Sequence, residues 1–103
     1  MDVEIGKVYS FKLNSGEEVT GTVKGIINSS PAPYYEVDEL LGTGMTQKGV
    51  QLMPAMMTTE IEGITNVYIS SVAMVKPPRD DVLDAYREST TGIKMPNKKI
   101  LLS

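Results

Sequence analysis

The chain has 103 residues and a formal net charge of −3, and the 41% of its residues that are hydrophobic can build the core of one small domain. No apolar run approaches the roughly 18 residues of a membrane span, and the acidic start MDVEIGKVYS has no signal-peptide pattern, so we expect a cytoplasmic protein with no membrane partner. Cysteine and histidine are both absent, which excludes disulfides, thiolate chemistry and the commonest general base at neutral pH.

Charge is unevenly distributed along the chain. Residues 1–93 carry seven basic and thirteen acidic groups, whereas residues 94–103 carry three lysines and no acid. An acidic body opposes non-specific binding to phosphate backbones. We expect the basic end to be a solvated terminus, and its lysines also suit contact with nucleic acid or with an acidic partner.

The first two predicted elements are strands. Residues 8–13, VYSFKL, and 18–27, EVTGTVKGII, alternate between apolar and polar positions, and the turn signal NSGE lies between them, so we predict a β-hairpin. The expected inner face of the second strand contains Val19, Gly21, Val23, Gly25 and Ile27. Glycines on an inner face permit a strong bend or a close approach of another backbone, which predicts a sharply curved strand.

Prolines and glycines interrupt the pattern in the middle of the chain. NSSPAP, residues 28–33, is expected to be a loop, and YYEVDELL, residues 34–41, a third strand with Tyr35 and Val37 on one face. GTGMTQKG, residues 42–49, predicts a flexible connection. Residues 50–63 are ambiguous, because their apolar content suits burial while Pro54 argues for an edge strand or a break; an extra hairpin is one interpretation.

The stretch NVYISSVAMVKPP, residues 66–78, changes phase. Val67 and Ile69 alternate with polar neighbours, but the next apolar pair, Val72 and Met74, has even numbers. One straight strand cannot keep both pairs on a buried face, because the side-chain period of a strand is two. We therefore predict two short strands that meet at a sharp bend at the two serines, residues 70 and 71.

After the two prolines the pattern becomes helical. RDDVLDAYREST, residues 79–90, has Val82, Leu83 and Tyr86 at helical spacing and acidic residues near its start, so it predicts one helix of about two to three turns. The residues after Gly92 are expected to be extended, with the apolar ILL near the end docked on the body or on a neighbouring chain.

The sum of these elements predicts a mainly β fold. Residues 1–78 are expected to form a small, five-stranded, strongly bent antiparallel barrel of the SH3-like kind, and residues 79–103 a short C-terminal helix and extended tail.

Two segments resemble the Sm-like (LSm) proteins, a family that includes bacterial Hfq. In LNSGEEVTGTVKGI the spacing of Gly16, Val19, Gly21 and Val23 is similar to the first half of the Sm1 motif. VYISSVAMVKP is similar in length and apolar placement to the Hfq segment that forms its last two strands. The resemblance covers residues 7–77 with gaps, and the acidic body with a long tail also resembles Sm-like proteins of tailed phages.

The resemblance implies a homo-oligomeric ring. In that fold the fourth strand of one subunit pairs with the fifth strand of the next, so the strand edges that would be exposed in a single subunit are paired in the ring. About five to seven subunits fit such a ring, and the sequence does not choose among them.

The resemblance also implies a site for single-stranded RNA in two loops that line the ring pore. The matching positions here are Asn28, Ser29, Tyr34, Tyr35, Ser70 and Ser71. This chain departs from the family because the first loop lacks its Asp and the second lacks its cation, and phosphate contacts supply much of the affinity for RNA. Each residue also has a purely structural interpretation: one tyrosine packs into the core, and the serines form the turn.

Two functions therefore stay open. The first is a ring-forming Sm-like module that binds single-stranded RNA, and the second is a structural or adaptor protein with the same barrel that binds a protein partner, for which the C-terminal tail is a candidate. We expect no enzyme, catalytic residue or cofactor, because no nucleophile elbow, P-loop or dinucleotide fingerprint is present. We expect no metal site either, since Glu36, Asp38 and Glu39 lack calcium-loop spacing and suit a solvated acidic face.

Overall fold

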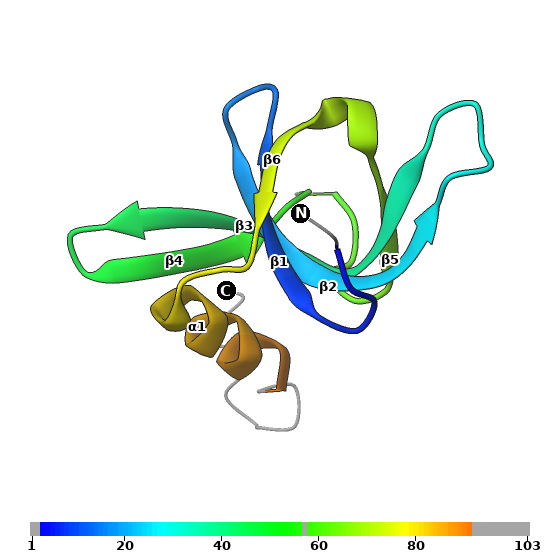
Figure 1. The fold of residues 1–103 in the computed structure, drawn as a ribbon. Coiled ribbons are helices and arrows are strands. Elements are labelled where there is room, and N and C mark those ends of the chain that lie inside the picture. Colours follow the sequence, from blue (N-terminus) through cyan, green and yellow to red (C-terminus); the bar gives the residue numbers. More distant parts are fainter. Residues whose placement is uncertain (1–2, 57, 92–103) are drawn as a thin grey trace.

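The computed structural model describes residues 3–56 and 58–91, which form a mainly β fold with one short helix (Figure 1). The strands are β1 (Val8–Leu13), β2 (Glu18–Ile27), β3 (Tyr34–Thr46), β4 (Gly49–Pro54), β5 (Ile64–Tyr68) and β6 (Val72–Lys76). A 3-10 turn, η1 (Ile69–Ser71), joins the last two strands, and α1 (Asp80–Thr91) follows them. The predicted β-hairpin of the first two strands and the predicted helix are both confirmed.

The strands form one antiparallel sheet that is not closed into a barrel. Its order is β4-β3-β2-β1-β6, and β5 pairs with the first part of β3. Among the described residues β5 and β6 do not pair with each other, because η1 directs β6 to β1 and leaves β5 on β3. The expectation of a five-stranded closed barrel is therefore wrong in both strand number and closure.

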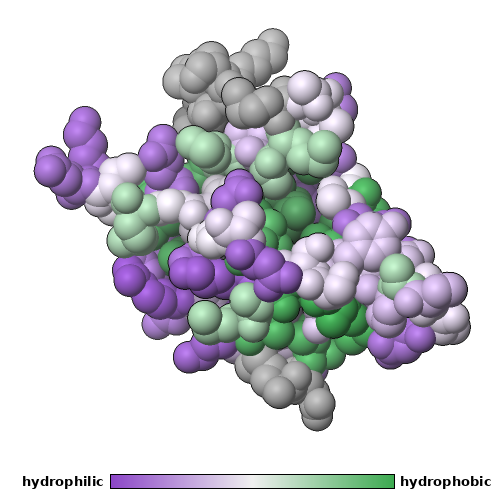
Figure 2. Space-filling model, turned by 90° about the horizontal axis from the view of Figure 1, so that it is seen from above, coloured by the Kyte–Doolittle hydropathy of each residue, from purple (hydrophilic) through white to green (hydrophobic). Residues whose placement is uncertain are grey.

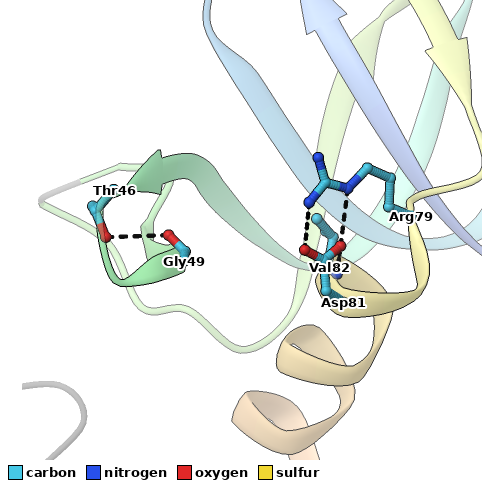
Figure 3. A network of polar contacts seen from close by, with 5 residues as sticks. All are labelled: Thr46, Gly49, Arg79, Asp81 and Val82. Carbon is cyan, nitrogen blue, oxygen red and sulfur yellow. Dashed lines mark hydrogen bonds and ion pairs between the residues drawn. The ribbon is translucent and has the colours of Figure 1, made fainter.

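The predicted flexible connection over residues 42–49 is also wrong. β3 continues to Thr46 and pairs with β4, so the two strands form a hairpin that projects from the body of the sheet (left in Figure 1). At its tip the Thr46 hydroxyl donates to the Gly49 carbonyl oxygen at 3.1 Å (Figure 3). The glycines misled the prediction, because Gly42 and Gly44 adopt ordinary strand geometry. Pro54 ends β4 at the edge of the sheet, as its chemistry requires.

A bulge in β3 lies opposite Gly21. Thr20 pairs with Leu41 but Thr22 pairs with Asp38, so two residues of β3 share one position of β2. Glu39, the first of these two residues, has a φ of 50°. A side chain at Gly21 would collide with that of Val37, so this glycine permits the close approach that the sequence predicts.

A second irregularity, at Lys24, reverses the expected faces of the end of β2. Val23 pairs with Val37 and Gly25 pairs with Glu36, so Lys24 is an extra residue that shifts the alternation. Ile26 therefore packs against the core in place of Ile27, and the Glu36 side chain covers Gly25. The prediction that Gly25 and Ile27 share the inner face is wrong for this reason.

The hydrophobic core lies inside the bent sheet. Its buried members come from β1, β2, β3 and β5, and they are Tyr9, Phe11, Val19, Val23, Val37 and Val67. Val72 and Val75 of β6 pack against this cluster, whereas Met74 is 59% exposed. The expected inward position of Met74 is wrong, because the β1–β6 register shifts beside Ala73.

Helix α1 packs on the outer face of the sheet through Val82 and Tyr86, which are both buried. The Tyr86 hydroxyl lies 3.0 Å from the Thr22 hydroxyl and 3.0 Å from the Glu39 carbonyl oxygen. Burial, ahead of all other causes, raises the pKa of Tyr86 to about 12. The buried tyrosine therefore fixes the helix to the sheet as a neutral phenol.

The first turn of α1 carries an exposed ion pair. Arg79 donates to both carboxylate oxygens of Asp81 (Figure 3), and these hydrogen bonds lower the pKa of Asp81. No helix within residues 3–56 and 58–91 is long and apolar enough to cross a membrane. The predicted extended tail and its docking ILL lie outside the described residues.

Candidate functional site

The structure brings the two loops of the predicted RNA site to one end of the sheet. The Ile69 amide at the start of η1 donates to the Pro33 carbonyl oxygen in the loop after β2, at 3.0 Å. Next to this contact Tyr34 and Tyr68 are cross-strand partners in the β3–β5 ladder. Both loops lie at the upper end of the molecule in Figure 1. Two segments that are about 40 positions apart in sequence therefore form one surface, which we call the loop face (residues 28–34 and 68–71).

An aromatic pair forms part of the loop face. The ring centroids of Tyr34 and Tyr68 are 5.5 Å apart, and their planes meet edge to face at 62°. Tyr34 is half-buried and Tyr68 is 44% exposed. Tyr68 is not among the site residues predicted from the sequence. Its position opposite Tyr34 depends on the strand register, and no local pattern gives that register.

Tyr35 lies on the other face of β3 and does not reach the loop face. Its ring packs 5.5 Å from that of Phe11, and its cross-strand partner is the buried Val67. Neighbouring residues of a strand point to opposite faces, so only one of the two adjacent tyrosines can serve a surface. The expectation that at least one of them packs into the core is confirmed, and that one is Tyr35.

The remaining candidates are exposed positions in the two loops. Asn28 and Ser29 lie in the loop after β2, and Ser70 and Ser71 lie in η1. The two η1 serines also have a role in the fold. Their backbone carbonyl groups accept hydrogen bonds from one residue of the β1–β2 turn. Asn14 donates from its side-chain amide to Ser70 at 2.7 Å and from its backbone amide to Ser71 at 2.8 Å. Asn14 therefore positions η1, and no local sequence pattern indicates this contact.

The loop face carries no positive charge. Neither residues 28–34 nor residues 68–71 include Lys or Arg, and Glu36 and Asp38 follow Tyr34 on the same face of β3. Figure 2, which views the molecule from this end, shows hydrophobic residues reaching the surface among polar ones. The loop face therefore offers aromatic rings, hydroxyls and amides in a neutral to acidic setting.

Metal chemistry finds no support within residues 3–56 and 58–91. No three His, Cys, Asp or Glu side chains of this part of the chain are grouped so that they could hold a metal ion. Glu36, Asp38 and Glu39 of β3 are each half-buried.

Comparisons with protein-family models and with curated proteins find no match to this sequence.

Proposed function

We propose that this chain is an Sm-like, ring-forming binding module in which β5 of one copy pairs with β6 of the next. The observation that carries this proposal is that β5 and β6 each have one edge unpaired among the described strands. Each is five residues long and uses one edge within the chain, β5 against β3 and β6 against β1. No other described strand pairs with their second edges. An open strand edge pairs readily with another chain.

Exposed apolar side chains on the same two strands support the proposal. Ile64 of β5 is 52% exposed, and Met74 of β6 is 59% exposed. Burial of such side chains between subunits contributes roughly 25 cal/mol for each Å² of apolar surface removed from water. Side chains of this kind beside an open strand edge are typical of an interface.

Single-stranded RNA is the ligand that we assign to the loop face of the ring. Tyr34 and Tyr68 supply aromatic surface for base stacking, which tolerates any base sequence. Asn28 and Ser29 supply hydrogen-bonding groups beside them. A ring repeats this face once in each subunit, so a single strand can bind several copies at once.

A protein partner is the second candidate ligand, and the charge of the loop face favours it. Phosphate contacts supply a large share of RNA affinity, yet no Lys or Arg lies in either loop. Glu36 and Asp38 would repel a phosphate backbone that approached along β3. In this alternative the same ring acts as an adaptor.

Light scattering on the eluting protein tests the ring. We expect a mass several times that of the 11.2 kDa chain at micromolar concentration. A mass of one chain at that concentration would overturn the proposal.

Filter binding with U-rich and A-rich oligonucleotides at two salt concentrations separates the two ligands. RNA binding predicts measurable affinity at low salt, a weaker affinity at high salt, and loss of binding in Tyr34→Ala. Ile5→Ala, a change at an exposed residue outside the loop face, is the control. An assembled ring that retains neither oligonucleotide at low salt would reject RNA as the ligand and support the adaptor.

A further inference from the structure

An open depression of about 190 Å³ lies where the β3–β4 hairpin leaves the body of the sheet. Its lining includes two carboxylates, two strand glycines, an amide and a thioether, from Glu17, Glu18, Gly42, Gly44, Gln51 and Met53. The two glutamates are its only charged lining residues among those the structure describes, and Met53 is 49% exposed. We call this depression the hairpin groove. It suits a ligand that is both basic and apolar.

Gly44 leaves part of the hairpin groove open, although the fold does not require a glycine at this position. Its φ is outside the left-handed region, and a Cβ built there would have no heavy atom within 4 Å. Glycine inside a strand weakens that strand, and it often marks a place where a ligand or another backbone approaches closely. The hairpin groove therefore has room above Gly44 for side chains of a bound segment.

The chain itself contains a segment of matching chemistry. Residues 94–103, KMPNKKILLS, carry three lysines and no acid, and an ILL triplet follows the last two lysines directly. Lysines complement the two glutamates, and the apolar triplet complements Met53 and the open strand at Gly44. No described segment between residues 3 and 91 combines adjacent lysines with an apolar triplet.

The face of the sheet on which α1 packs guides the choice of the copy that supplies the segment. Tyr86 binds Thr22, which shares the outer face with Thr20 and with the cross-strand partner of Thr20, Leu41. Gly42 follows Leu41 directly and therefore faces the other side. Helix α1 thus packs on the side of the hairpin opposite to Gly42, so we assign the segment in the groove to a second copy and not to the same chain.

We propose that residues 94–103 of one copy bind in the hairpin groove of a second copy. Lys98 and Lys99 pair with Glu17 and Glu18, and the ILL triplet packs against Met53. This inference rests on the proposed self-association, and it adds a second contact between subunits to the β5–β6 pairing.

Zero-length crosslinking of the full chain tests the inference. A carbodiimide joins carboxylates to amines that are in direct contact, and heavy-isotope and unlabelled chains refolded together reveal which copy supplies each partner. We expect heavy–light crosslinks from Glu17 or Glu18 to Lys98 or Lys99. Glu4 and Lys7, whose carboxylate and ammonium groups are 3.3 Å apart, provide a crosslink within one chain as the internal reference.

Variants give the second arm of the test. The double change Glu17→Lys with Glu18→Lys should abolish the heavy–light crosslinks to the last lysines, and Gly44→Val should reduce them several-fold by filling the groove. Glu60→Lys, the same type of substitution at an exposed loop residue outside the groove, should leave them intact.

The outcomes separate this inference from the proposed ring. Suppose that light scattering shows a ring. If Lys98 and Lys99 then crosslink only to residues other than Glu17 and Glu18, or only within one chain, the groove inference is wrong and the ring is unaffected. A chain that stays monomeric overturns both.

Discussion

The hydroxyl group of Tyr86 lies 3.0 Å from the backbone carbonyl oxygen of Glu39, the residue at which β3 bulges with a φ of 50°. The same hydroxyl lies 3.1 Å from the Asp38 carbonyl oxygen, so the phenol proton is shared between two carbonyl groups. A bulge disrupts the ladder of backbone hydrogen bonds, and buried carbonyl groups there need another donor. Tyr86 supplies that donor, so helix α1 and the bulge in β3 stabilise each other.

Replacing this phenol should therefore weaken the fold. Tyr86→Phe keeps the ring but leaves the two carbonyl groups and the Thr22 hydroxyl without this partner. We expect the free energy of unfolding to fall by about 1–3 kcal/mol, measured by urea denaturation. Tyr68→Phe makes the same change on an exposed ring and should shift it by less than about 0.5 kcal/mol. Equal effects of the two changes would contradict the role of Tyr86.

The raised pKa of Tyr86 predicts a loss of stability in alkali. Its folded pKa of about 12 exceeds the ordinary value of 10.0, so the neutral phenol is the form that the fold favours. The corresponding stability is fully present below pH 10 and is lost as the pH rises from 10 towards 12. We expect the stability difference between the native chain and Tyr86→Phe to shrink between pH 9 and pH 11.5 in urea denaturation. A constant difference across this range would show that Tyr86 titrates normally.

Two strand glycines should respond oppositely to alanine. In Gly21→Ala the new methyl group collides with the fully buried Val37, and such overpacking costs about 1–3 kcal/mol. In Gly44→Ala the methyl group points into open space, and the gain in strand preference should leave stability unchanged or raise it by up to about 1 kcal/mol. Denaturation curves of both variants check this pair, and a neutral Gly21→Ala would contradict the close approach of β2 and β3.

A matched pair of methionines tests the subunit interface in the proposed ring. Met74 of β6 and Met45 of the hairpin are 59% and 57% exposed, so lysine fits either position without disturbing the core. Met74→Lys should lower the mass measured by light scattering towards that of one chain, because it places a charge beside the β6 edge. Met45→Lys should leave the mass unchanged. A larger loss of mass in Met45→Lys than in Met74→Lys would indicate that the subunit interface lies at the hairpin instead.

Of the two adjacent tyrosines predicted for the site, only Tyr34 lies on the loop face. The sequence identified two adjacent tyrosines beside a loop, and alternation alone requires that one faces inward. Which one faces inward depends on the register of β3 against β5, where Tyr34 pairs with Tyr68 and Tyr35 with Val67. That register joins segments far apart in the chain, so Tyr68 could not be found from local pattern.

The strands β1 and β2, the helix and the break at the two serines were determined by the sequence alone, because each depends on side-chain periodicity and turn residues within a few positions. The tertiary structure decided which residues of β2 and β6 face the core, because single extra residues at Lys24 and Ala73 reverse the alternation only against a paired strand. It also decided that the sheet stays open and that both loops meet, through contacts such as that of Asn14 with Ser70 across 56 positions. Such contacts depend on the spatial arrangement of the whole chain, which no local stretch of sequence encodes.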